Sequence, residues 1–141
     1  MPFNFNPLIP EISCADFEKS LSFYTDILGF KIEYQRPEHQ FAFLSHQGSQ
    51  IMLSQVSDVW KTGEFEYPFG RGINFQMLVD DIDKIIASLR AQAYPLMVEP
   101  EDSWYRVEHE LVGLREFLVM DPDGYALRFA QDLGIKPLAP I

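Results

Sequence analysis

The stretch REFLVMDPDGYALRFAQ, residues 115–131, predicts two strands joined by a tight turn. Pro122 sets the φ angle that such a turn needs, and Gly124 can adopt a positive φ without steric cost. An aspartate on either side of Pro122 is expected to hydrogen-bond to the local backbone, as turn aspartates do. The hairpin places Arg128 on the inward face of its second strand.

A matching hairpin occurs earlier in the chain. The segment FAFLSHQGSQIMLSQ (41–55) matches FLVMDPDGYALRFAQ (117–131) when 76 is added to each residue number, because 41 + 76 = 117. Gly48 then falls on Gly124, so both hairpins turn at a glycine.

A helix with one apolar face is predicted ahead of each hairpin. Apolar residues follow Asp16 at spacings of 4, 3 and 4, at Phe17, Leu21, Tyr24 and Leu28. Adding 65 to the first three numbers gives the apolar residues that follow Asp81, namely Ile82, Ile86 and Leu89. Each aspartate suits a helix N-cap, where its side chain accepts from a free backbone N–H group.

The predicted unit is a strand, a helix and three strands, used twice. Buried strands are expected before the helices at 8–14 and 73–79, and after them at 30–35 and 94–99. Repeat 1 covers about 7–55, the connector 56–72, and repeat 2 about 73–132. Since the offset rises from 65 to 76, the second copy holds 76 − 65 = 11 extra residues, near 101–113. We expect one α+β domain over 1–141, with two βαβββ modules forming cupped mixed sheets.

Composition narrows the classes of partner. The net charge of −10 and the pI of about 4.6 disfavour nucleic acid and anionic membranes and favour a cationic ligand. No apolar stretch approaches the roughly 18 residues of a membrane span, and the start lacks the pattern of a signal peptide. With one cysteine, Cys14, no internal disulfide can form. We therefore expect a cytoplasmic protein.

The chain shows no familiar catalytic motif. His39, His46 and His109 share no helix face or metal-ligand spacing, so solvated or locally bonded side chains are expected there. Cys14 falls on a buried strand, where inert packing is expected. Neither a nucleophile elbow nor a glycine-rich nucleotide loop is present. We expect no cofactor.

Three segments resemble the vicinal-oxygen-chelate superfamily, which includes glyoxalase I, extradiol dioxygenases, fosfomycin-resistance enzymes and metal-free bleomycin-resistance proteins. They are DFEKSLSFYTDILGF (16–30), LVDDID (78–83) and REFLVMDPDGYALRF (115–129), and with the repeat they account for nearly the whole chain. The resemblance is nearest the metal-free bleomycin-resistance branch. It implies paired βαβββ modules in a homodimer whose ligand clefts lie between subunits.

The resemblance also implies where a metal would bind. Metal-using members hold a divalent ion at positions that correspond here to Ile9, Met52, Asn74 and Arg128. None of these is His, Glu or Asp, and an arginine would repel the ion, so no metal site is predicted. Arg128 can instead pair with an inner carboxylate such as Glu11, or contact an anionic group of a ligand.

In bleomycin-resistance proteins, aromatic side chains hold flat rings of the drug, and Phe41 aligns with one of them, although plain core packing is an equal alternative. The second ring is usually a Trp ahead of the REF segment, where this chain has Val112 and Gly113. Trp60, Trp104 or Tyr105 can supply the missing surface. The predicted ligand-binding residues are Phe41, Trp60, Asn74, Trp104, Tyr105, Arg115 and Arg128.

The leading functional hypothesis is therefore a metal-free protein that sequesters a small cationic or aromatic antibiotic of the bleomycin type and catalyses no reaction. The alternative is a metal-dependent lyase, isomerase or dioxygenase, which requires His or Glu ligands. A metal-free enzyme or a housekeeping binder with a similar pocket is a third possibility.

Overall fold

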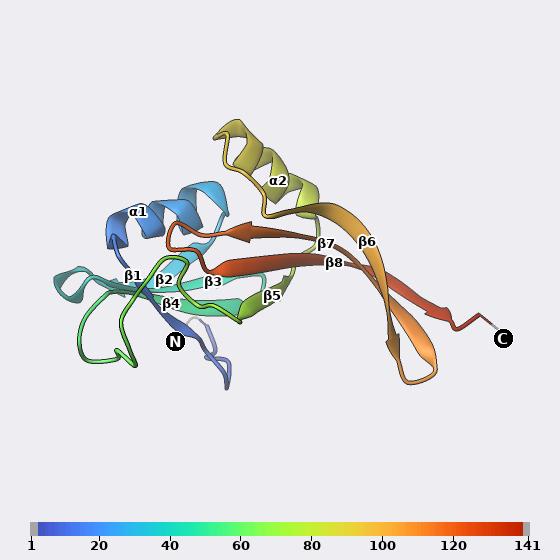
Figure 1. Cartoon of the computed structure of the whole chain (residues 1–141), viewed down its shortest axis with the longest axis horizontal. Helices are drawn as coiled ribbons and strands as arrows, with labels where there is room; N and C mark the ends of the chain where they lie inside the picture. The colour runs from blue at the N-terminus through green and yellow to red at the C-terminus, as the bar shows by residue number, and fades with distance from the viewer. Residues whose placement is uncertain (1–2, 140–141) are drawn as a thin grey trace. The chain divides into compact units, whose positions relative to one another are not determined.

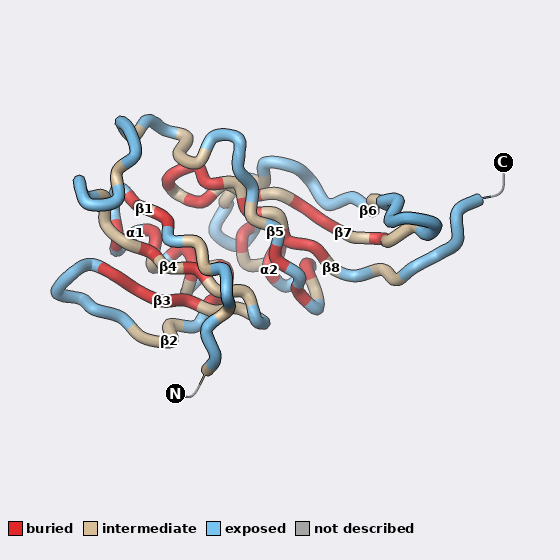
Figure 2. The backbone as a smooth tube through the Cα atoms, turned by 90° about the horizontal axis from the view of Figure 1, so that it is seen from below, coloured by how far each residue is buried: buried red, intermediate tan, exposed pale blue. Residues whose placement is uncertain are grey.

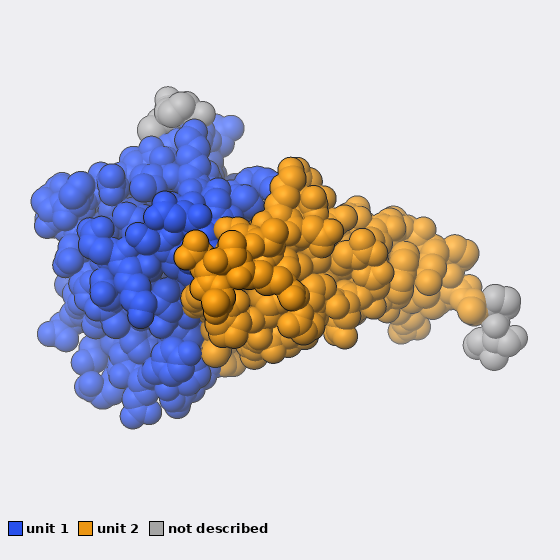
Figure 3. All heavy atoms as spheres, turned by 90° about the horizontal axis from the view of Figure 1, so that it is seen from above, with its two compact units in different colours: residues 1–71, 121–125 blue, residues 72–120, 126–141 orange. Residues whose placement is uncertain are grey.

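The computed structural model describes residues 3–139 and divides into two compact units (Figure 3). Unit 1 comprises residues 1–71 and 121–125, and unit 2 comprises residues 72–120 and 126–141. No helix within residues 3–139 is long and apolar enough to cross a membrane. The expectation of one domain over 1–141 stays a prediction.

Unit 1 contains the first strand–helix–three-strand copy (Figure 1). Its strands pair in the order β1-β4-β3-β2, with β1 and β4 parallel and the other pairs antiparallel. A π-helical segment, η1, continues α1, and a short 3₁₀ turn, η2, precedes β3. The elements are β1 (Glu11–Cys14), α1 (Phe17–Ser22), η1 (Phe23–Ile27), β2 (Lys31–Arg36), η2 (Pro37–His39), β3 (Phe41–His46) and β4 (Ser49–Gln55).

Unit 2 repeats this topology (Figure 1). Its strands pair in the order β5-β8-β7-β6, and β5 and β8 are the parallel pair. The elements are β5 (Asn74–Leu78), α2 (Ile82–Ala91), β6 (Val98–Val107), β7 (Glu110–Met120) and β8 (Ala126–Pro137). The predicted fold of two βαβββ modules with mixed sheets is confirmed.

Both helices begin as the sequence predicts. Asp16 accepts a hydrogen bond from the Lys19 backbone N–H at 3.2 Å, and Asp81 accepts from that of Asp83 at 2.9 Å. Each N-cap aspartate therefore satisfies a donor that the first helical turn leaves free.

A second cap at each helix comes from the last strand of its module. The Gln55 side-chain carbonyl accepts from the Phe17 N–H at 2.9 Å, and that of Gln131 accepts from the Ile82 N–H at 3.1 Å. These residues are repeat equivalents, since 55 + 76 = 131 and 17 + 65 = 82. The internal repeat thus extends to individual hydrogen bonds.

Each sheet buries one face against the helix of its own unit, and the buried segments run along β3, β4, β7 and β8 (Figure 2). Alternate strand residues point to opposite faces, so the side chains between these form a second face on each sheet, here called the open face, although some of them, such as Phe43 and Glu116, are also buried. In unit 1 the buried face includes Ile12, Cys14, Phe17, Ala42, Leu44, Ile51 and Leu53. In unit 2 it includes Met77, Ile82, Ile86, Leu89, Phe117, Val119, Leu127 and Phe129.

The first strands are shorter than predicted. The apolar runs at 8–14 and 73–79 were expected to be buried from end to end, but β1 starts at Glu11 and β5 at Asn74. Leu8 and Ile73 lie just before these strands and are 82% and 56% exposed. The hydrophobic pattern alone did not show that β1 and β5 begin to pair with β4 and β8 only at Glu11 and Asn74.

The strand predicted at 94–99 is displaced and extended. β6 covers Val98–Val107 and forms a long hairpin with β7, where Trp104 lies opposite Gly113. The additional residues of the second copy therefore form paired strands. Most of β6 is exposed, so backbone pairing holds the hairpin where apolar burial does not.

Candidate functional site

The open face of the sheet in unit 1 carries two rows of side chains, defined by the strand pairing. One row runs across the strands through Glu11, Met52, Phe43 and Tyr34. The neighbouring row runs through Ser13, Ser54, Phe41 and Arg36.

Aromatic side chains from the start of the chain pack on the first row. The rings of Phe3 and Phe5 lie 5.4 and 5.3 Å from that of Phe43, and Tyr34 stacks on Phe43 at 5.2 Å. Four aromatic side chains thus form a local cluster. It leaves the second row as the part of this face that can accept a ligand.

The second row borders a cavity of about 400 Å³. This volume falls in the range of small-molecule sites. Two of the predicted ligand-binding residues, Phe41 and Trp60, line it together. The full lining consists of Glu11, Arg36, His39, Gln40, Phe41, Ser54, Gln55, Val56, Ser57, Val59 and Trp60.

Phe41 forms part of the floor of this cavity, with 5% of its surface exposed. The Arg36 guanidinium lies 4.0 Å from the centre of the Phe41 ring, a cation–π contact that covers one ring face. A flat ligand therefore meets the planar guanidinium first, and this group itself stacks well on aromatic rings.

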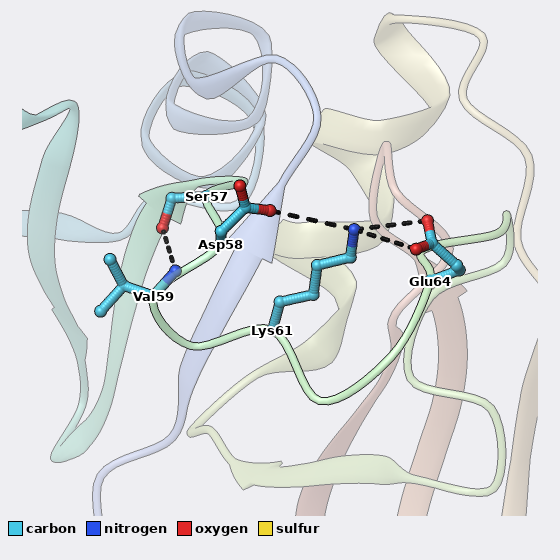
Figure 4. A network of polar contacts seen from close by, with 5 residues as sticks. All are labelled: Ser57, Asp58, Val59, Lys61 and Glu64. Atoms are coloured by element: carbon cyan, nitrogen blue, oxygen red, sulfur yellow. Dashed lines mark hydrogen bonds and ion pairs between the residues drawn. The ribbon is translucent and has the colours of Figure 1, made fainter.

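Trp60 approaches the cavity from the connector and is 70% exposed. The loop around it is held by Lys61, whose ammonium lies 3.2 Å from Glu64 and 3.9 Å from Asp58 (Figure 4). The Val59 N–H also donates to the Ser57 hydroxyl at 3.4 Å. Exposed ion pairs of this kind contribute at most about 1 kcal/mol each, so the loop can adjust to a ligand.

A smaller cavity of about 270 Å³ lies elsewhere in unit 1 and contains none of the predicted site residues. Residues 62–71 of the connector and Tyr125 surround it. Arg71 lies there, but its guanidinium donates to the backbone carbonyls of Pro68 and Tyr67 at 3.2 and 2.9 Å. The Arg71 guanidinium is therefore engaged in hydrogen bonds within the connector.

In unit 2, three of the predicted residues share the open face of the sheet. Asn74 on β5 and Arg128 on β8 belong to neighbouring rows, because Asn74 pairs with Ala126 and Gln76 with Arg128. Tyr105 reaches this face from β6, where its hydroxyl donates to Glu116. That hydrogen bond raises the pKa of Tyr105, which keeps the phenol protonated.

The remaining two predicted residues lie on the opposite face of the β6–β7 hairpin. Trp104 covers Gly113, where a Cβ atom would come within 2.6 Å of the indole, and the Lys136 ammonium lies 4.0 Å from the indole ring. Arg115 forms a bidentate pair with Asp102 at 2.8 and 3.1 Å, which lowers the pKa of Asp102. The structure therefore separates Trp104 from Tyr105, its neighbour in the sequence.

The cysteine and the turn aspartate occupy buried positions in unit 1. Burial raises the pKa of Cys14 to about 12, and nearby Asp123 and Asp121 add to the effect, so the thiol stays protonated. Asp121 accepts from the backbone N–H groups of Asp123 and Tyr125 and from the Tyr24 hydroxyl. Burial outweighs these three bonds and raises the pKa of Asp121 to about 6.

Comparison with known proteins identifies the family. Residues 8–129 match the model of the glyoxalase/bleomycin resistance protein/dioxygenase superfamily. The chain belongs to this superfamily. A bleomycin resistance protein from Geobacillus stearothermophilus is 27% identical over 139 residues, covering 89% of this chain and 96% of the relative. A probable lactoylglutathione lyase from Synechocystis is 27% identical over 130 residues, covering 89% and 94%.

A solved structure supports the same arrangement of elements. TioX from Micromonospora sp. ML1 matches with a TM-score of 0.69 at 18% identity, covering 92% of this chain and all (100%) of that chain. At this identity the likeness concerns the fold.

The residues at the metal positions of the superfamily do not fit a divalent ion. In unit 1 they are Ile9, which has no donor atom, and Met52, which offers only a thioether. In unit 2 they are Asn74, with a neutral amide, and the cationic Arg128. Within residues 3–139, no group of three or more His, Cys, Asp and Glu side chains is arranged to hold a metal. No catalytic step through a metal is supported.

Two site residues escaped sequence reasoning. Arg36 sits two positions after Tyr34 on β2 and faces the cavity by strand alternation, but its register with Phe41 comes only from pairing. Glu116 lies in the REF segment, and its burial at 5% exposure depends on strand pairing. Neither Arg36 nor Glu116 lies in a sequence motif that indicates a role in a binding site.

Proposed function

We propose that this protein binds and sequesters a small, planar, cationic molecule of the bleomycin type without catalysing a reaction. The observation that carries the proposal is the cavity in unit 1, where Trp60, the Arg36–Phe41 stack and the Glu11 carboxylate line one space. Sequestration lowers the free concentration of a drug and needs no reacting group.

The chemistry of the lining supports this class of ligand. A flat ring can lie against Trp60 or against the Arg36–Phe41 stack, and each stacked pair contributes about 0.5 to 1.5 kcal/mol beyond area burial. Glu11 offers an acceptor for a cationic group of the ligand. The net charge of −10 adds a long-range attraction for cations.

The metal-dependent lyase is the second candidate, because of the similarity to the probable lactoylglutathione lyase; isomerase and dioxygenase activities are the other reactions in this class. The side chains at Ile9, Met52, Asn74 and Arg128 argue against it. Metal analysis of protein purified without chelator separates the two. Less than a tenth of an equivalent of any divalent transition ion, with no lyase activity on the methylglyoxal–glutathione adduct, supports sequestration; a stoichiometric ion with turnover supports the lyase.

Calorimetric titration with metal-free bleomycin tests the binding proposal. We expect a dissociation constant of about 1 μM or lower, equivalent to roughly −8 kcal/mol. Replacing Trp60 by Ala should weaken binding about tenfold, since it removes the exposed ring. Trp104→Ala serves as the matched control, because Trp104 lies in unit 2 against Gly113.

Binding that survives Trp60→Ala but is lost in Trp104→Ala would move the site to the β6–β7 hairpin. No heat and no shift in melting temperature at 100 μM bleomycin would reject these drugs as ligands.

We further propose that the functional form is a cytoplasmic homodimer. Leu8 and Ile73 are exposed apolar residues at equivalent positions of the two modules, since 8 + 65 = 73, and exposed apolar surface favours association. Cys14 is a free, buried thiol, in keeping with a reducing compartment.

A further inference from the structure

Glu116 is a buried carboxylate with one oxygen that no group of unit 2 satisfies. It lies on β7 with 5% of its surface exposed. The Tyr105 hydroxyl donates to its Oε1, whereas Oε2 is buried and has no hydrogen-bond partner among the described residues. Tyr105 therefore fixes the orientation of the carboxylate and leaves one strong acceptor unused.

On the adjacent strand β8, Arg128 has a hydrogen-bond donor that complements the unused acceptor of Glu116. Its Nε is buried and has no hydrogen-bond partner within the described part of the chain. On β7 and β8, Glu116 pairs with Ala130 and Leu118 pairs with Arg128, so Glu116 and Arg128 occupy diagonal positions on the same face. Side chains at such positions lie roughly 7 to 8 Å apart at their Cα atoms.

Two buried polar atoms on one face, Glu116 Oε2 and Arg128 Nε, lack a hydrogen-bond partner among the described residues, and this requires an explanation. An unsatisfied buried donor or acceptor costs about 1 to 3 kcal/mol, and more when it is charged. The two groups do not satisfy each other, since no carboxylate of unit 2 lies within ion-pair distance of Arg128 among the described residues. A ligand that hydrogen-bonds to both atoms removes this free-energy cost, so the two atoms together can recognise a ligand.

We propose that this face binds a planar carboxamide-type group, in which an N–H donor and a carbonyl acceptor sit on one carbon. The N–H donates to Glu116 Oε2 and the carbonyl accepts from Arg128 Nε–H. A ligand carboxylate would be repelled by Glu116, and a ligand ammonium by Arg128, so the pair selects a neutral group with both functions. The Arg128 side chain is half-buried, so part of it reaches solvent, where a ligand can approach it.

Neighbouring side chains extend the site. Leu118 lies opposite Arg128, and Leu78 lies beside Ala130 on the same face. Leu78 is exposed and offers apolar contact for the remainder of a ligand. Because this face belongs wholly to unit 2, the inference stands apart from the cavity of unit 1 and from the proposed function.

Benzamide is the probe, and its close analogues are the controls. Two-dimensional NMR of the ¹⁵N-labelled full chain, titrated to tens of millimolar, should show saturable shifts at the amides of Glu116, Leu118 and Arg128. N,N-dimethylbenzamide lacks the donor, and benzoate replaces the amide with a charge. Each should bind at least about tenfold more weakly, as expected when a site group loses its partner.

Variants then test each contact separately. Glu116→Gln keeps the size but can place an amide N–H where Oε2 stood, and Arg128→Lys keeps the charge but removes Nε. Each should weaken benzamide at least about fivefold. Glu110→Gln on the same strand and Arg106→Lys on β6 change exposed residues and should leave binding unchanged.

The ligand series on the unaltered protein keeps the test valid if a variant fails to fold. Equal affinity for benzamide and N,N-dimethylbenzamide would overturn the proposal, and so would benzamide shifts confined to the unit 1 cavity. Absence of any saturable shift would mean that an ordered water alone satisfies the two atoms, and it would overturn the proposal as well. None of these results bears on whether bleomycin binds in unit 1.

Discussion

Asp121 combines a structural role with a buried charge. Its carboxylate accepts two backbone bonds that shape the turn, at 2.9 and 3.0 Å, and a third from Tyr24 at 2.8 Å. Its neighbours Asp123, Tyr24 and Cys14 supply no compensating positive charge. Ionisation of this group therefore opposes folding.

Replacing Asp121 by Asn should change how stability depends on pH. The pKa of Asp121 is about 6 in the folded chain against an ordinary 3.8. Its contribution is thus fully present below pH 3.8 and is lost as pH rises through 6. The unfolding free energy of the natural protein, relative to Asp121→Asn, should fall by up to about 3 kcal/mol between pH 4 and pH 7, as measured by urea denaturation.

Asp83→Asn is the matched control, because Asp83 is exposed on α2. The pH-dependent loss for Asp121→Asn should exceed any change that Asp83→Asn produces over the same pH range. A pH-independent difference for Asp121→Asn would show that this carboxyl titrates normally.

The sequence predicts the structural roles of some residues but not of others. Asp121 and Gly124 could be anticipated, because a turn limits its residues by local geometry, and Gly124 indeed has φ +93°. Glu116 and Arg36 could not, because their roles depend on cross-strand register. Arg128 lies between these cases: its inward direction follows from alternation, but the absence of a hydrogen-bond partner for its Nε among the described residues does not.

The two helices show how a repeated sequence produces a repeated contact. Gln55 ends β4 opposite Cys14, and Gln131 directly follows the last β8 residue that pairs with β5. Each reaches the N-terminus of the helix that follows the first strand of its module. Helix starts leave free N–H groups that must find acceptors. A glutamine at this position therefore links the last strand of each module to its helix.

Removal of either glutamine cap should destabilise the protein by a similar amount. Gln55→Ala and Gln131→Ala each leave a helix N–H without its acceptor, so we expect losses of about 1 to 2 kcal/mol in urea denaturation. Gln35→Ala on the exposed part of β2 should cost less than about 0.5 kcal/mol. A loss at only one of the two caps would show that the repeat is not energetically equivalent.

Elements were predictable where apolar periodicity and turn residues agreed. The helices, the hairpin at 41–55 and the turn at 121–124 satisfy that condition. β6 does not: the polar segment EDSWYRVEHELVG (101–113) carries no clear alternation, and it forms strands through pairing with β7. Pairing of this kind is a tertiary contact that single-sequence patterns do not record.

For association between copies of the chain, charge and apolar surface act in opposite directions. Each copy carries a net charge of −10, so two copies repel each other at low salt. The exposed side chains of Leu8 and Ile73 favour burial against a partner. If both effects operate, raising the salt concentration screens the repulsion and leaves the apolar contact.

Sedimentation equilibrium should therefore show a homodimer that tightens severalfold when NaCl rises from 50 to 500 mM, because the Debye length falls well below the size of the chain. The double variant Leu8→Asp, Ile73→Asp adds charge and removes apolar surface, so it should sediment as a monomer at micromolar concentration. Val107→Asp changes an exposed apolar residue at the tip of the β6–β7 hairpin and is the matched control. A dimer that weakens with salt would show that ion pairs drive association, and one disrupted by Val107→Asp alone would place the interface at the hairpin.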